Sequence, residues 1–416
     1  MKGLLNADNR KKILNLIYSV GATAIFNMVI QFLLYPQFER QMGGETYGIV
    51  LSVISLIAIT AGTCGYSVSC SRLLGVNDGR TASSDYNLIL LGMGVLGSMI
   101  GIGYLFYLGL ATPLSVGLYI VLMFTTMLRY YSEIEFRLKT DFFRYMLYYL
   151  LVSVGYVVGL FLFRLTKEWM LALIVGEVLA LLYVAIRGTI YRPPFFKKTA
   201  NFSPVFASIV FVLISALIDN VTMHADRILL LAITGDGSAV TIYYISSLIG
   251  KLIALLTGPI NALIISYLVR YQGGLTKKMW YAVIFVALLF GGLSFVAGVI
   301  VSPWIIGILY PDQVGEASRY FAPAILGQIF YFVSGVLMAT LLRFKGEKKQ
   351  FFFNGAYAVE FFACVAVGTV LGGLSGFVWS ILIANALRFV AAVIWGFFGK
   401  KKDEIPVVTE ESSGNE

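Results

Sequence analysis

Long apolar segments recur along this chain and limit what it can fold into more than any other feature. Each is long enough to cross the hydrocarbon core of a bilayer as a helix, which takes about 20 residues. A segment such as Tyr281 to Leu289 is apolar on nearly every side, whereas barrel strands alternate apolar and polar residues. We therefore predict an all-α polytopic membrane protein with about twelve transmembrane helices, placed roughly at 13–34, 47–71, 86–109, 114–136, 145–163, 168–188, 204–232, 238–268, 279–302, 319–342, 352–371 and 375–398.

Composition excludes the main alternatives to a membrane protein. Hydrophobic residues make up 59% of the 416 residues and charged residues only 13%, whereas soluble domains have about 45–50% and about 25%. Cys64, Cys70 and Cys364 lie in apolar runs without the spacing of a disulfide framework or a metal site. The polar start leads into a long apolar segment without a small-residue cleavage site, so we expect the first helix to be retained.

Lys and Arg residues are distributed unequally between the two sides of the predicted helices. The N-terminus, every second connection and the C-terminal end hold 24 of them, and the opposite connections hold Arg40, Arg164, Lys167 and Arg319. Cytoplasmic loops carry such an excess. We therefore expect a multi-pass protein of the cytoplasmic (cell inner) membrane with both termini in the cytoplasm. The net charge of +9 is then a signal of topology, and we expect no nucleic-acid partner.

The connection Gly188 to Ser203 divides the predicted helices into two sets of six. Transporters are commonly built from such repeats, with the substrate site between them. Gly43 to Gly48 precedes the second helix and Gly235 to Ser238 precedes the eighth, which is a weak internal echo. We predict an N-terminal lobe at 1–190, a cytoplasmic linker at 191–203, a C-terminal lobe at 204–402 and a disordered cytoplasmic tail at 403–416.

Two prolines fall inside predicted helices. Pro259 lies in the eighth and Pro323 in the tenth. Because proline removes a backbone hydrogen bond and clashes with the preceding turn, we expect both helices to kink. Kinks beside a central cavity would suit alternating access.

The seventh predicted helix carries the richest set of polar groups inside the membrane. At 100° per residue these side chains share one face, and apolar residues cover the other. One interpretation is a cavity that binds substrate or an ion, and the other is an internal ion pair between an aspartate and Arg227 that ties helices together. The face consists of Asp219, Asn220, His224, Asp226 and Arg227.

Other polar residues within the spans are candidates for the same cavity. Lys251 lies on a stripe of small residues in the eighth helix and is our best candidate for a cation that binds a ligand. Asn27 and Gln31 share a face of the first helix, where they would line a cavity or bond between helices. Glu360 and Arg388, on neighbouring helices, are expected to pair, and Glu177 has no assigned role.

No pattern of an enzyme stands out in the sequence. A single histidine, His224, excludes His-based metal clusters, and the chain lacks CxxC, a GxxxxGK[ST] phosphate loop and a GxSxG elbow. We therefore expect no catalytic residues, no metal and no cofactor. Short external connections favour a carrier over a membrane glycan polymerase or scaffold, which stay as alternatives.

Several short motifs, taken in order, resemble the polysaccharide and O-antigen flippases of the multidrug/oligosaccharidyl-lipid/polysaccharide (MOP) exporter superfamily. The resemblance covers nearly the whole chain, although the Gly-Tyr spacing around the eighth helix departs from the family pattern. The motifs are the basic Arg10-Lys11-Lys12, Gly43 to Gly48, Asp226 to Leu230 followed by Tyr243, Leu309-Tyr310-Pro311, and Gly372 to Gly376.

The resemblance implies two six-helix lobes that move an undecaprenyl-diphosphate-linked oligosaccharide across the membrane by alternating access. Arg227 and Lys251 would bind the diphosphate, and Asn27, Gln31 and Asn220 the glycan, because these pairings suit their charge and hydrogen-bonding groups. Asp219, Asp226 and His224 would couple transport to H⁺ or Na⁺. Expected partners are this lipid-linked substrate, the bilayer, the coupling ion and glycan polymerases. The rival within the superfamily is a multidrug or organic-cation antiporter.

Overall fold

Helices and their short connections make up the described part of the chain, in which there is no strand. The structure is a computed structural model, and it describes residues 7–76, 82–191, 193–254, 261, 264, 268 and 273–398. Within these ranges, the side chains of residues 7–13, 16, 219, 347 and 348 lie outside the description. Pro259 and the predicted tail at 403–416 also fall outside the described residues.

Ten helical stretches of the described chain are long and apolar enough to cross a membrane, or eleven if the bent helix at 202–234 counts as one. The last stretch counts once, although Gly372 and Gly373 have non-helical backbone angles that divide it into two helical segments. Large apolar side chains on the outside of the helices, such as Phe211 and Leu371, are about four-fifths exposed at 80% and 81%. The chain is therefore an all-helical, multi-pass membrane protein, as the apolar segments predicted.

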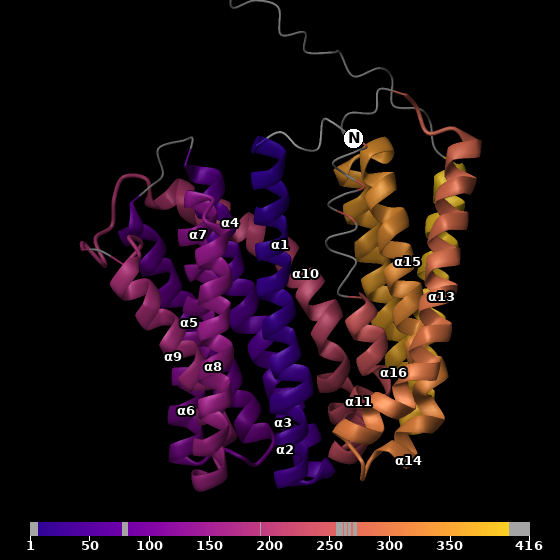
Figure 1. Ribbon diagram of the computed structural model, residues 1–416, viewed down its shortest axis with the longest axis horizontal. Helices are drawn as coiled ribbons and strands as arrows, with labels where there is room; N and C mark the ends of the chain where they lie inside the picture. The colour runs from indigo at the N-terminus through magenta and orange to yellow at the C-terminus, as the bar shows by residue number, and fades with distance from the viewer. Residues whose placement is uncertain are drawn as a thin grey trace, which may run out of the picture. The chain divides into compact units, whose positions relative to one another are not determined.

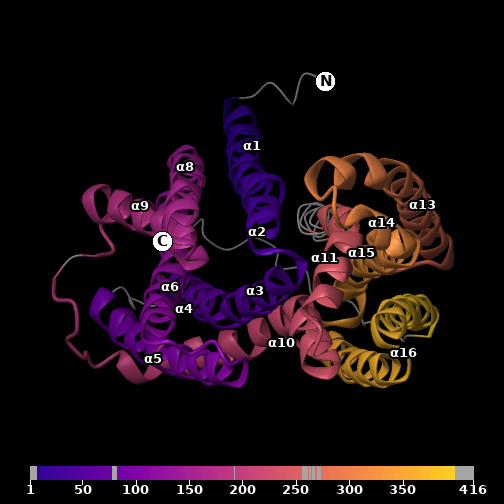
Figure 2. The same ribbon diagram turned by 90° about the horizontal axis from the view of Figure 1, so that it is seen from below.

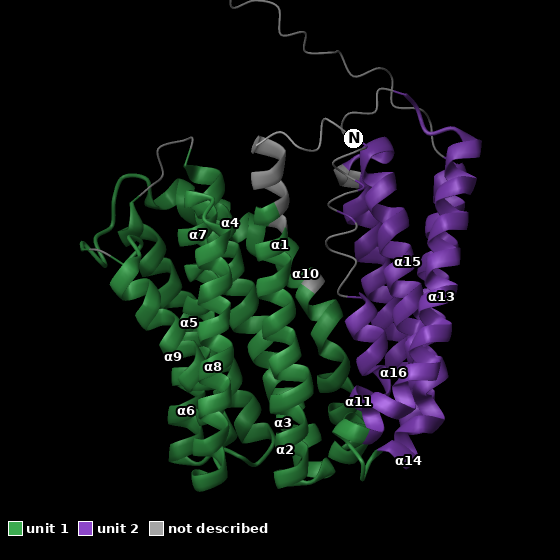
Figure 3. Cartoon of the chain, viewed as in Figure 1, with its two compact units in different colours: residues 1–242, 308–313 green, residues 243–307, 314–416 purple. Residues whose placement is uncertain are grey.

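The described chain forms two compact units (Figure 3), residues 1–242 with 308–313 and residues 243–307 with 314–416. Gly237–Ala254 (α11) begins in unit 1 and continues into unit 2. The remaining helices of unit 1 are α1 (Ala7–Met28), η2 (Val29–Leu34), α2 (Tyr35–Met42), α3 (Gly44–Ile57), η3 (Ala58–Gly62), α4 (Thr63–Gly75), α5 (Ser83–Tyr107), α6 (Pro113–Ser132), α7 (Ile134–Lys139), α8 (Phe142–Thr166), α9 (Trp169–Arg187) and α10 (Phe202–Thr234). Those of unit 2 are α13 (Lys277–Leu309), α14 (Val314–Ala317), η4 (Ser318–Tyr320), α15 (Phe321–Lys345) and α16 (Glu347–Phe397).

Within unit 1 the long helices run side by side, as two perpendicular views agree (Figure 1, Figure 2). Helix α8 packs on α1 and α9, and α6 packs on α4 and α9. Helix α10, which follows the predicted linker, packs on α3 and α4 of the same unit. Helix α10 therefore belongs to the same compact unit as the helices before it. The predicted division into lobes at 1–190 and 204–402 remains a prediction.

The start of α3 and the start of α11 approach each other closely within unit 1. A Cβ added to Gly48 would lie 1.8 Å from the carbonyl oxygen of Gly237, and one added to Gly237 would lie 2.1 Å from that of Glu45. Thr241 Oγ1 donates a hydrogen bond of 2.6 Å to the Gly44 carbonyl. The two glycine motifs that echo each other in the sequence therefore pack together, and only residues without a side chain fit at their crossing.

A third motif, distant in the sequence, packs next to this crossing. The segment Ile308 to Gln313 belongs to unit 1 and contains the predicted Leu309-Tyr310-Pro311. Arg40 Nη2 donates to the Ile308 carbonyl at 2.8 Å, and the Tyr47 and Tyr310 hydroxyls lie 3.4 Å apart. The last residues of α13 and those that follow it are thus held against α2 and α3, by contacts between residues more than 260 positions apart.

The predicted kink at Pro323 was wrong. Helix α15 begins at Phe321, so Pro323 lies in its first turn, where the backbone N–H has no partner within the helix to lose. The proline inside a described helix is instead Pro303 of α13.

Replacing Gly48 by Ala should destabilise the protein, because the added methyl group meets the backbone of Gly237. Overpacking of this kind costs about 1–3 kcal/mol. The matched control is Gly103→Ala in α5, where an added Cβ meets nothing within 4 Å. Thermal unfolding of the detergent-purified variants should show a lower Tm for Gly48→Ala only, and equal Tm values would contradict the close crossing.

Candidate functional site

The predicted pair Asp226 and Arg227 is buried on α10, with 4% and 7% of each residue exposed. Arg227 Nη1 donates to the Ser55 hydroxyl of α3 at 3.3 Å. The backbone N–H of Arg227 donates to Asp226 Oδ1 at 2.9 Å. A guanidinium group is therefore held inside unit 1, at the contact of α10 with α3.

The other polar residues of α10 lie around a bend. The helix turns by 49° between Phe202–Ile218 and Asn220–Thr234. Asn220 Nδ2 donates to the Ala216 carbonyl at 2.9 Å, and Thr222 Oγ1 to the Ile218 carbonyl at 2.8 Å. Side-chain bonds to the preceding turn often accompany helix bending. His224 is half-buried, and the side chain of Asp219 lies outside the described residues.

The predicted pair on the first helix is placed at a change of helix type. Asn27 Nδ2 donates to the Thr23 carbonyl one turn earlier, at 2.8 Å. Gln31 is half-buried and lies in the π-helical segment η2. Such segments inside α-helices frequently occur at functional sites, and nothing in the apolar pattern of the sequence indicated this one.

Lys251 lies in unit 2, within an aromatic environment. Its Nζ is 5.0 Å from the ring centroid of Tyr243 on the same helix, and that ring meets the Phe377 ring edge to face at 4.8 Å. A cation over an aromatic face is attracted by the ring quadrupole. Because Arg227 belongs to unit 1 and Lys251 to unit 2, their action on one ligand stays a prediction.

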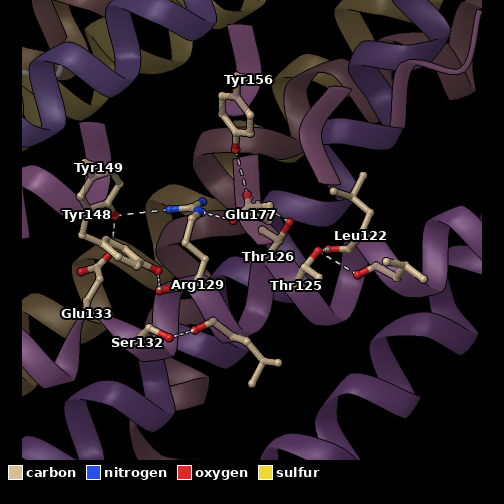
Figure 4. A network of polar contacts seen from close by, with 12 residues as sticks. Leu122, Thr125, Thr126, Arg129, Ser132, Glu133, Tyr148, Tyr149, Tyr156 and Glu177 are labelled. Carbon is tan, nitrogen blue, oxygen red and sulfur yellow. Dashed lines mark hydrogen bonds and ion pairs between the residues drawn. The ribbon is translucent and has the colours of Figure 1, made fainter. Parts of the chain in front are cut away.

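A buried ion pair in unit 1 was missed from the sequence. Arg129 Nε of α6 and Glu177 Oε2 of α9 are 2.7 Å apart, and 4% and 2% of their side chains are exposed. The Tyr156 hydroxyl donates to Glu177 Oε1 at 2.8 Å, and Thr126 Oγ1 does so at 3.4 Å. Arg129 Nη1 donates to the Tyr149 hydroxyl at 3.3 Å, so both charges have several polar neighbours (Figure 4).

The network continues toward the end of the bundle that carries α7. The Tyr149 hydroxyl donates to Glu133 Oε1 at 2.5 Å, and Arg137 pairs with Glu133 Oε2 at the same distance. The Tyr148 hydroxyl donates to the Arg129 carbonyl at 3.0 Å (Figure 4). A chain of charged and phenolic groups thus ties α6, α8 and α9 together.

Arg72 and Arg129, which are among the 24 basic residues counted on the predicted cytoplasmic side, are buried. Arg129 is a residue of α6, and the signal for this was its position inside the predicted segment 114–136. Arg72, near the end of α4, is 7% exposed and bonds to Tyr131 and to Ser83. Without these two residues, a large excess of basic residues still remains on the predicted cytoplasmic side.

The expected pair of Glu360 and Arg388 is absent from the described residues. Cys364 Sγ lies 3.5 Å from Glu360 Oε1 as a hydrogen-bond donor. The Arg388 guanidinium lies between two tyrosine rings, 4.7 Å from the Tyr331 centroid and 4.3 Å from that of Tyr357. Tyr357 in turn donates to Asn385 Oδ1 at 2.7 Å. The neighbours of the Arg388 guanidinium are thus aromatic rings, where we had expected the Glu360 carboxylate.

Metal ligands do not gather in the part of the chain that the structure describes. No group of three His, Cys, Asp or Glu side chains there could hold an ion. Cys64, Cys70 and Cys364 are half-buried and unpaired.

Solved structures of membrane transporters share this fold, whereas no family model and no curated protein matches the sequence. An inward-facing multidrug-resistance MATE transporter of the MOP superfamily has a TM-score of 0.69 at 16% identity, covering 91% of this chain and 97% of its own. The lipid II flippase MurJ, in an inward closed conformation, also has 0.69, at 13% identity over 92% and 87%. A MOP transporter from Pyrococcus furiosus, described as having a binding pocket of reversed polarity, has 0.60 at 15% identity over 92% and 93%. The chain therefore has the fold of MOP-superfamily transporters and flippases.

Replacing Arg129 or Glu177 singly by Gln should strongly destabilise unit 1, because each change leaves the other charge buried without its partner. Breaking a buried pair from one side costs about 3–5 kcal/mol. Arg144→Gln is the matched control, since its pair with Asp141 is more exposed, at 55% and 33%. Thermal unfolding should show the loss, and the double variant Arg129→Leu/Glu177→Leu should recover part of it. Single variants as stable as the control would show that the pair carries little stability.

Proposed function

We propose that the protein is a flippase that moves a lipid-linked oligosaccharide across the cytoplasmic membrane for cell-surface polysaccharide synthesis. The substrate would be carried on undecaprenyl diphosphate, and movement would occur by alternating access. The fold supports transport in general, and the choice of substrate rests on the charges inside the helices.

The observation that carries this proposal is the placement of two cations on neighbouring helices of the chain, Arg227 on α10 and Lys251 on α11. Three carboxylates of unit 1 form ion pairs: Glu177 pairs with Arg129, Glu133 with Arg137, and Glu135 with Lys139. Arginine and lysine residues occur on helices α10 and α11, where Arg227 bonds to a serine and Lys251 lies over a tyrosine ring. Guanidinium and ammonium groups bind phosphate oxygens. These positions therefore suit an anionic head group.

The remaining parts of the substrate need different neighbours. Asn27, Gln31 and Asn220 offer neutral amide groups to sugar hydroxyls, and the polyprenyl tail can stay in the bilayer. We infer that both termini are cytoplasmic, because the basic excess lies on their side. A glycan polymerase is the natural partner, since it would consume the flipped product.

A multidrug or organic-cation antiporter is the second candidate. It is favoured by the equal TM-scores of the multidrug transporter and the lipid II flippase, and by the buried Asp226 on α10. An organic cation would need carboxylates in the cavity, whereas a diphosphate would need Arg227 and Lys251. The two candidates thus make opposite demands on the same helices.

Neutralising either predicted cation should abolish glycan transport. We expect Arg227→Gln and Lys251→Gln to be inserted and expressed but inactive, and Lys251→Arg to keep part of the activity because it keeps the charge. Arg319→Gln, an exposed arginine of unit 2, is the control. The measurement is translocation of a fluorescent lipid-linked oligosaccharide in proteoliposomes. Full transport by both neutral variants would contradict the assignment.

Transport should be coupled to an ion gradient, with Asp219, Asp226 and His224 as the coupling groups. A membrane potential supplies about 2.3 kcal/mol per charge per 100 mV, and a carboxylate beside Arg227 could exchange H⁺ or Na⁺ as the substrate charge arrives. Flipping should then be faster with an imposed proton or sodium gradient, and Asp219→Asn and Asp226→Asn should remove this dependence. Rates insensitive to both gradients and to both substitutions would show that the carboxylates are structural.

A further inference from the structure

The connection between α9 and α10 is held at both ends by buried carboxylates. Glu135, 4% exposed, accepts hydrogen bonds from the backbone N–H groups of Thr189 at 2.9 Å and Ile190 at 3.2 Å. Asp85, 1% exposed, accepts one from the N–H of Thr199 at 2.8 Å. The backbone at each end of the segment between Ile190 and Thr199 is thus tied to unit 1.

Between these two attachments the segment presents an unusual surface. Phe195 is 44% exposed and Phe196 62% exposed, and the next residues, Lys197 and Lys198, are exposed as well. The Lys198 ammonium lies 4.8 Å from the ring centroid of Phe202, at the start of α10. Two aromatic rings and two positive charges are therefore held outside the packed interior of unit 1.

The helices on either side carry exposed apolar side chains close to this surface. Ile186 in the last turn of α9 is 76% exposed, and Phe206 near the start of α10 is 48% exposed. Exposed apolar side chains on transmembrane helices face lipid tails. Because the connection joins the ends of both helices, we expect Phe195 and Phe196 to lie close to the level at which the apolar surface of these helices ends.

We propose that Phe195 and Phe196 insert into the interface of the bilayer while Lys197 and Lys198 bind anionic lipid head groups. Aromatic rings favour this depth, and basic residues beside a membrane are attracted to its negative surface. The combination of apolar and basic groups is the one that binds interfacial surfaces. The connection between α9 and α10 is thereby a membrane anchor, whichever substrate the protein carries.

The test measures the depth of the segment in the full-length protein. In a background with Cys64, Cys70 and Cys364 replaced by Ser, Phe196→Cys is labelled with a fluorescent nitrobenzoxadiazole group. Ala200→Cys, exposed in the same connection just after Thr199, is the matched control. Both proteins are reconstituted in vesicles of phosphatidylcholine alone or with phosphatidylglycerol, and gel filtration checks that both are folded. Quenching is measured with aqueous acrylamide and with a nitroxide-labelled lipid.

We expect the label at position 196 to be quenched severalfold more by the lipid nitroxide than by acrylamide, and the label at 200 to show the reverse. Removing phosphatidylglycerol, or adding Lys197→Gln and Lys198→Gln, should reduce the protection at 196. Equal acrylamide quenching at both positions would overturn the proposal. Protection from both quenchers at 196 would also overturn it and would indicate a protein partner. Insertion that is indifferent to lipid charge and to both lysines would overturn the role of anionic head groups.

Discussion

A charge inside hydrocarbon must find a partner or water, and this constraint organises the interior of the protein. Where Arg129 enters unit 1, Glu177, Thr126 and three tyrosine hydroxyls lie around the pair or its backbone. Where Arg388 enters unit 2, two tyrosine rings flank it. The first arrangement neutralises the charge, and the second leaves the cation with polarisable neighbours. Each interior charge is costly, so each one needs a structural or a functional reason.

The fold was largely predictable because its main determinant is local. An apolar segment of sufficient length must form a helix in a bilayer, since no water is available to satisfy its backbone. The division at Gly372 and Gly373 also follows from residue type, because Gly373 adopts a positive φ of 54°. Contacts between distant residues were not predictable in this way. Hydropathy could not show that Arg129 meets Glu177, or that Arg388 lies between aromatic rings instead of beside Glu360.

The motifs behave differently from the charges, because separate weak patterns come together in space. Gly48 and Gly237 cross without room for a side chain, and Tyr310 joins them through Tyr47. The sequence indicated each motif, and only the structure shows that they form one junction in unit 1. For the candidate site, the sequence found Arg227 and Lys251 as interior cations. Their common action on a ligand remains a prediction, since it depends on how the two units meet during transport.

The central claim is that the cargo is an anionic lipid-linked glycan, and the most direct test is a comparison of cargoes for the wild-type protein. Proteoliposomes would be loaded in parallel with a fluorescent undecaprenyl-diphosphate oligosaccharide and with a fluorescent organic cation. The account predicts protein-dependent translocation of the glycan lipid, competition by unlabelled polyprenyl diphosphate, and no protein-dependent movement of the cation. Extrusion of the cation without movement of the glycan lipid would contradict it and identify a multidrug antiporter.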